Sequence, residues 1–162
     1  MQEPWNRSRW PIVLALLAAA CGSSPSSPSP SAAIGLTATP NPVSSHLCTG
    51  CGAGSTDREV TVQLTIQETG GVAVTVDAVA VSLRETGSNA VIAAGEFDGS
   101  GVRFFAGTER IPANGSIVLR DIGAHYAAVQ AGKAATLTLT VRVRDDRGAT
   151  LSRDISVAVT AT

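Results

Sequence analysis

The stretch "REVTVQLTIQE" at residues 58–68 decides the fold, because its side chains alternate strictly between apolar and polar. The apolar members are Val60, Val62, Leu64 and Ile66, and the polar members between them are Thr61, Gln63, Thr65 and Gln67. Successive side chains of a β-strand point to opposite faces of its sheet. This period of two therefore predicts a strand that buries one face and exposes the other.

The next apolar stretch, "VAVTVDAVAVSL" at residues 72–83, continues the alternation but changes its phase. The apolar side chains fall first on Val72, Val74 and Val76, and then on Val79, Val81 and Leu83. A change of phase moves the apolar set to the other face of a strand. The segment therefore predicts either a β-bulge near Asp77 and Ala78 or a strand that crosses between two sheets.

The C-terminal part of the chain predicts a hairpin of two long strands. "ATLTLTVRVR" at residues 135–144 is joined by "DDRG" to "ATLSRDISVAVTAT" at residues 149–162. Alternation predicts the buried set Leu137, Leu139, Val141, Val143, Leu151, Ile155, Val157 and Val159. Acidic residues followed by glycine are typical of the turn that such a hairpin needs.

The middle of the chain is less regular. "AVIAAGEF" at residues 90–97, "VRFFAG" at 102–107 and "GSIVLRDI" at 115–122 predict short strands between glycine, proline and asparagine turns. No amphipathic helix of useful length is expected, and "GAHYAAVQAGKAA" at residues 123–135 is compatible with one helical turn.

About seven or eight short strands with regular turns predict one all-β antiparallel sandwich over residues 34–162. The chain resembles the immunoglobulin-like and fibronectin type III-like modules of exported bacterial proteins. "LTATPNPVSS" resembles their opening strand, "RIPANGSIVL" the turn before a strand, and "VRVRDDRGATL" their closing hairpin. The domain has no tryptophan and no cysteine pair suited to joining two sheets, so the resemblance implies a relative of the fold and not an antibody-type domain.

Residues 1–20 predict an export signal. Arg7 and Arg9 supply the positively charged n-region, and residues 11–20 form a short apolar h-region. Ala18, Ala19 and Ala20 are small residues at the expected cleavage site. The apolar run is too short to span a bilayer as a permanent helix.

"LLAAAC", which ends at Cys21, resembles the lipobox of bacterial lipoproteins, although Ala18 stands where that family usually has leucine. The resemblance implies that Cys21 is lipidated on sulfur and becomes the mature N-terminus. Residues 21–33 then predict a disordered, Ser/Pro-rich tether. The alternative is an ordinary secreted protein that is cut near Ala20 and keeps Cys21 as a free thiol.

The lipobox resemblance also implies a location in the cell envelope. Several acyl chains hold a protein stably on a membrane, with the domain facing the periplasm or the cell exterior. Gly22, which is not the aspartate of the family's sorting rule, implies the outer membrane if the cell has two membranes.

Charge and motifs exclude several function classes. The net charge is −1, which favours neither nucleic acid nor acidic lipid headgroups as a partner. The sequence contains no nucleophile elbow and no glycine-rich phosphate loop between a strand and a helix. We therefore expect no enzyme activity and no cofactor.

The loop "SSHLCTGCGAGS" at residues 44–55 leaves three interpretations open. The first is a Cys48–Cys51 disulfide, because an exported protein meets an oxidising compartment. The second is a zinc or copper site that uses His46, Cys48 and Cys51, with His125 as a fourth ligand that nothing in the sequence brings near. The third is a redox-active thiol pair, which the absence of a predicted helix after Cys51 disfavours.

Two functions follow from these predictions. The first is a membrane-anchored binding, adhesion or structural module, whose partner is an unknown protein or envelope polymer and whose expected contact surface is the loop at residues 41–57. The alternative is an extracytoplasmic zinc- or copper-binding protein that uses His46, Cys48, Cys51 and His125.

Overall fold

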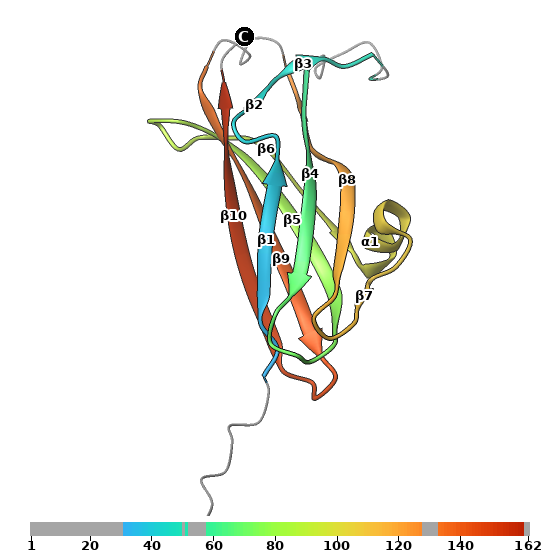
Figure 1. Cartoon of the computed structure of the whole chain (residues 1–162). Helices are drawn as coiled ribbons and strands as arrows, with labels where there is room; N and C mark the ends of the chain where they lie inside the picture. Colours follow the sequence, from blue (N-terminus) through green and yellow to red (C-terminus); the bar gives the residue numbers. More distant parts are fainter. Residues whose placement is uncertain (1–30, 50, 52–57, 128–132, 161–162) are drawn as a thin grey trace, which may run out of the picture.

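The computed structural model describes residues 31–49, 51, 58–127 and 133–160, which form two β-sheets packed face to face and one short helix (Figure 1). The described residues form ten strands. Seven of them have six or more residues, and β2, β3 and β7 have two each. The predicted all-β class is therefore correct, and the predicted number of strands matches the long ones. The predicted signal peptide and most of the predicted tether, residues 1–30, lie outside the described part of the chain.

The first sheet is built around β4 (Arg58–Glu68). β8 (Ser116–Tyr126) pairs with β4 along one edge. β1 (Ile34–Thr39) and β3 (His46–Leu47) share the opposite edge, with β1 beside the end of β4 and β3 beside its beginning. All of these pairs are antiparallel.

The second sheet has the order β2-β10-β9-β5-β6, and β7 also pairs with β5. Its strands are β2 (Val43–Ser44), β5 (Val74–Glu85), β6 (Val91–Asp98), β7 (Arg110–Ile111), β9 (Ala135–Asp145) and β10 (Thr150–Thr160). The expected antiparallel arrangement is confirmed for the other strand pairs, and among the described strands only β2 departs from it, since it pairs with β10 in parallel. The reason is that the chain crosses from β1 to β2 without a hairpin, and it therefore meets β10 running in the same direction.

The core lies between the sheets and is built from valine, leucine and isoleucine. Alternation predicted it correctly in β4, where Val60, Val62, Leu64 and Ile66 are all buried. The pairing of β5 with β9 shifts its register between Val76 and Ala78, which confirms the bulge that the change of phase predicted.

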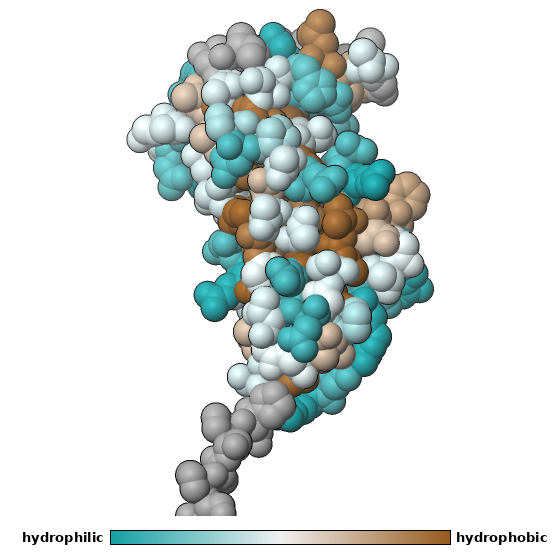
Figure 2. All heavy atoms as spheres, viewed as in Figure 1, coloured by the Kyte–Doolittle hydropathy of each residue, from teal (hydrophilic) through white to brown (hydrophobic). Residues whose placement is uncertain are grey.

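The C-terminal hairpin forms as predicted, but its second strand is less buried than expected. β9 contributes Leu137, Leu139, Val141 and Val143 to the core, and β10 contributes Val157 and Val159. Leu151 and Ile155 are only partly buried and pack against the core. β2 pairs with β10 only at Val159 and Thr160, so the first part of β10 is an open sheet edge. Figure 2, in the same view as Figure 1, shows apolar surface across the middle of the sandwich.

The predicted strand at residues 102–107 is wrong, because this segment belongs to the helix α1 (Gly99–Ala106). The Asp98 side chain accepts hydrogen bonds from the backbone N–H groups of Ser100 and Gly101, and Gly107 ends the helix at a φ of 78°. These two caps outweigh the strand preference of the valine and the two phenylalanines between them. No helix in the described residues is long and apolar enough to cross a membrane.

The residues that pair with β4 show which elements lie at each end of the sandwich. Ile34, at the start of β1, lies opposite Glu68, and His46 lies opposite Glu59. At about 3.4 Å per residue, these two points are about 30 Å apart along the strand. The described chain therefore enters the sandwich at one end, and β3 lies at the other (Figure 1).

Candidate functional site

Three neighbouring strands place His46, Glu59 and His125 in one row across the first sheet. Glu59 on β4 lies directly opposite His46 on β3 and, on its other side, directly opposite His125 on β8. Residues that are directly opposite one another point to the same face of a sheet. Their neighbours Val60, Ala124 and Tyr126 are buried, so the row lies on the outer face.

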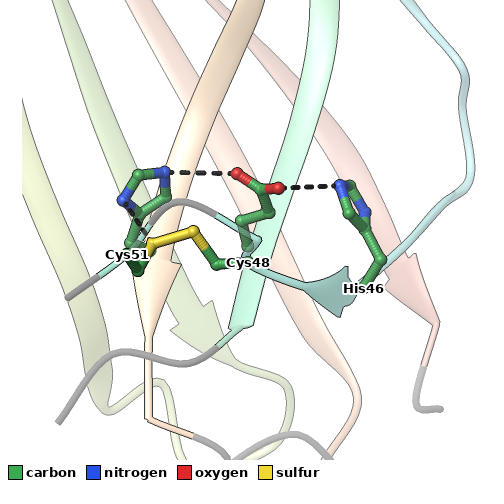
Figure 3. The surroundings of a disulfide bond; sticks show 5 residues. His46, Cys48 and Cys51 are labelled. Atoms are coloured by element: carbon green, nitrogen blue, oxygen red, sulfur yellow. Dashed lines mark hydrogen bonds and ion pairs between the residues drawn. A yellow bond between two sulfur atoms is a disulfide. The ribbon is translucent and has the colours of Figure 1, made fainter. Parts of the chain in front are cut away.

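The Glu59 carboxylate lies between the two imidazoles, with one oxygen facing each (Figure 3). His46 Nε2 is 3.2 Å from Glu59 Oε1, and His125 Nε2 is 3.4 Å from Glu59 Oε2. The side chains of His46 and His125 are 54% and 55% exposed, and that of Glu59 is 22% exposed. The row is therefore open to water and to small ligands. Hereafter it is called the His-Glu-His row.

A disulfide bond joins Cys48 and Cys51 beside this row, as the first interpretation of the loop proposed. The two Cα atoms are 5.5 Å apart, and Cys51 Sγ is 3.5 Å from His125 Nδ1 (Figure 3). The bond therefore contacts the ring of His125 on the side away from Glu59. While the sulfurs are bonded to each other, neither is a thiolate that can bind a metal.

The structure brings together three residues of the expected metal set, Cys48, Cys51 and His125, and the sequence could not place His125. His46, the fourth, lies on the other side of Glu59 from His125. The sulfurs of Cys48 and Cys51 and one ring nitrogen of His125 lie within 4.8 Å of one another. Glu59, however, was missed, although it contacts both histidines. The alternation of β4 puts Glu59 on the outer face, but its partners depend on strand pairing that the sequence does not display.

Removing the disulfide is expected to have a small effect on stability. A ring closed by residues three positions apart limits the unfolded chain only slightly, so the Cys48→Ser/Cys51→Ser variant should lose about 2 kcal/mol or less. Urea unfolding with and without reductant measures this. A loss as large as that of a core truncation would show that the bond holds the sheets together and does not merely stiffen the loop.

A groove of about 520 Å³ opens along the side of the sandwich, between β6 of one sheet and β8 of the other. Its lining includes Val81, Phe97, Phe105, Ile122 and His125. The helix α1 contacts β5, β6 and β8 and so closes part of the gap between the sheets. His125 therefore belongs both to the row and to the lining of this groove.

The loop expected to contact a partner lies at the same end as the row. Within residues 41–57, the described part comprises β2, β3 and the disulfide, whereas residues 50 and 52–57 lie outside the described residues. The expected contact surface thus includes His46 and both bonded cysteines.

Fold and site together define an all-β, two-sheet domain with an exposed His-Glu-His row beside a disulfide. No protein-family model and no curated protein matches the sequence. Among solved structures, the chain is similar to one described as "X-ray structure of Northeast Structural Genomics Consortium target SoR45", with a TM-score of 0.48 and 9% sequence identity. The similarity covers 80% of this chain and 86% of the other. At this level it carries no conclusion about function, which must come from the residues themselves.

Proposed function

We propose that this protein is an exported lipoprotein, anchored to a membrane through Cys21, whose immunoglobulin-like sandwich is a binding, adhesion or structural module. Its partner is another protein or a polymer of the cell envelope. "LLAAAC" and the Ser/Pro-rich segment after it support the anchor, and the disulfide supports an oxidising compartment.

The strand order supports an immunoglobulin-like sandwich. In that fold, the first, second and fifth strands (A, B and E) share one sheet, and the third, sixth and seventh (C, F and G) share the other. The long strands β1, β4 and β8 occupy the first set of positions, and β5, β9 and β10 occupy the second. β6 extends the second sheet in the manner of the additional strand of variable-type domains.

The observation that carries the proposed role is the position of the two ends. The chain enters the sandwich at β1, about 30 Å along the sheet from the His-Glu-His row. An anchor at the N-terminus leaves the opposite end facing away from the membrane. That end carries β3, the disulfide and the row, and it is the surface that a partner in the surrounding space would meet first.

Fatty-acid labelling tests the anchor. In bacterial cells fed an alkyne-tagged fatty acid, the wild-type chain should become labelled and the Cys21→Ser chain should not. The Cys48→Ser/Cys51→Ser variant, which removes two thiols but keeps Cys21, should be labelled like the wild type. An unlabelled wild-type chain, or equal labelling of the Cys21→Ser chain, would contradict the proposal.

Metal binding is the second candidate function, and one observation favours it. The pairing of β3, β4 and β8 brings His125 to the cysteine pair. Three members of the expected set, Cys48, Cys51 and His125, are therefore close together, but the two sulfurs are bonded to each other in this structure. His46 is separated from them by Glu59. In the oxidised protein a metal ion would need a different donor set.

A further inference from the structure

We propose that the His-Glu-His row is a binding site for a divalent transition-metal ion, with Zn²⁺ as the reference ion and Glu59 as a direct ligand. The inference goes beyond the proposed anchor and partner, because it requires neither. It also replaces the thiolates of the sequence-based hypothesis with a carboxylate, which remains available while the disulfide is intact.

The donor set of the row suits such an ion. Two imidazole nitrogens and one carboxylate oxygen are a recurring protein ligand set for zinc, with the remaining position open to water or another ligand. Imidazole also suits copper and nickel. The ligands come from three adjacent strands that pair directly, so the backbone holds them at fixed spacing before any ion binds.

Each imidazole lies at ligand spacing from one oxygen of Glu59, but the two imidazoles contact different oxygens, on opposite sides of the carboxylate. Two ligands bound to zinc at about 2.0–2.1 Å with a tetrahedral angle lie about 3.4 Å from each other. His46 Nε2 and Glu59 Oε1 are 3.2 Å apart, and His125 Nε2 and Glu59 Oε2 are 3.4 Å apart. Binding of one ion therefore requires both rings to turn toward each other, and both histidines are more than half exposed, so the packed interior does not hold the rings in place.

The disulfide has a positioning role in this site. Cys51 Sγ contacts His125 Nδ1 at 3.5 Å, and this contact leaves Nε2 as the ring nitrogen that faces Glu59. Neighbours that fix the orientation of a ligating imidazole strengthen metal sites. Reduction of the bond by a thiol reductant would release two thiols within 4.8 Å of a His125 nitrogen, which would create a different, sulfur-containing donor set.

Zinc titration of the full chain tests the proposal. The Cys21→Ser chain, which has no free thiol when Cys48 and Cys51 are bonded, is purified in detergent without chelator or reductant, and mass spectrometry verifies the disulfide. Calorimetric titration with Zn²⁺ alone should give one ion per chain. Titration with Co²⁺ should give a visible spectrum without a sulfur-to-metal charge-transfer band.

Three substitutions should each weaken zinc binding at least about tenfold: His46→Ala, Glu59→Gln and His125→Ala. Glu85→Gln is the matched control, because it makes the same carboxylate-to-amide change at a strand residue that pairs with Lys133 and not with a histidine. This control should bind zinc like the parent chain. Glu59→Gln keeps the size of the side chain, so circular dichroism should show an unchanged fold.

Three results would overturn the proposal. The first is the absence of zinc binding to the disulfide-bonded chain. The second is binding that survives Glu59→Gln unchanged. The third is binding that requires reductant and is lost in the Cys48→Ser/Cys51→Ser variant, which would assign the ion to the cysteines. None of these results affects fatty-acid labelling of Cys21. The anchor and the metal site are therefore tested independently of each other.

Discussion

Replacing Glu68 with glutamine is expected to lower the free energy of unfolding by about 3 kcal/mol. Glu68 is fully buried at the end of β4. Its carboxylate accepts hydrogen bonds from four backbone N–H groups, namely those of Ala33 at 3.2 Å, Gly70 at 2.6 Å, Gly71 at 3.0 Å and Asn114 at 2.8 Å. Glutamine keeps one oxygen and turns an NH₂ group toward donors, so some buried N–H groups lose their acceptor.

The effect is large because this one side chain connects three segments that are distant in sequence. The N–H groups belong to the residue before β1, to the turn between β4 and β5, and to the turn before β8. All three lie at the end of the sandwich where the described chain begins. The His-Glu-His row lies about 30 Å away, so Glu68→Gln should leave the proposed zinc binding at the row unchanged in the folded protein.

The contribution of Glu68 should disappear in acid. Burial works to raise the pKa of Glu68, but the four backbone N–H groups outweigh it and lower the pKa below its ordinary value of 4.5. The folded state therefore binds this proton less readily than the unfolded state. The stabilisation is fully present above about pH 4.5 and is lost as the pH falls through the lower pKa of the folded state.

Urea unfolding of the wild type and Glu68→Gln from pH 7 down to pH 3 measures both effects. The difference in unfolding free energy should be largest at pH 7 and should shrink toward pH 3. A difference that stays constant over this range would show that the charge of Glu68 does not stabilise the fold.

Replacing Gly123 with alanine should cost a similar amount, about 3 kcal/mol, through backbone overlap. A Cβ atom at Gly123 would lie 1.7 Å from the carbonyl oxygen of Val60 and 2.8 Å from the Cα of Thr61. Both contacts are backbone atoms of β4, so no side chain can move away to relieve them. β8 must shift away from β4, and the hydrogen bonds between these two strands must weaken.

The same substitution should disturb the His-Glu-His row, because His125 is two residues further along β8. Gly35→Ala is the matched control: Gly35 also pairs with β4, but a Cβ there meets nothing within 4 Å. We expect Gly35→Ala to change stability by less than about 0.5 kcal/mol. Equal unfolding free energies for the two variants would contradict the close approach of β8 to β4.

The sequence predicted those parts of the fold whose signals are local. Alternation in residues 58–68 and 135–144 located two strands and their buried faces, and the change of phase near Asp77 located a bulge. The helix α1 was missed although its caps, Asp98 and Gly107, are visible in the sequence, because the apolar residues between them favour a strand. Glu68 is two residues after Ile66, so alternation places it on the same, inward face of β4. The sequence could therefore have predicted a buried charge at this position.

The candidate site was harder to predict because it depends on pairing between distant segments. His46, Glu59 and His125 meet only when β3 and β8 pair with β4 in one particular register. A shift of one residue would turn one histidine to the other face of the sheet. Residue types identified His46, Cys48, Cys51 and His125 as metal-ligand candidates, but Glu59 gave no signal of its own in a strand with many outward polar residues.

The intact mass of the protein extracted from membranes, measured with and without reductant, shows whether the module is lipid-anchored and whether Cys48 and Cys51 are bonded to each other. We expect a chain that begins at Cys21, carries added acyl mass, and lacks two hydrogens that reductant restores. A chain without acyl mass would contradict the anchor, and a chain with its full complement of thiols before reduction would contradict the disulfide.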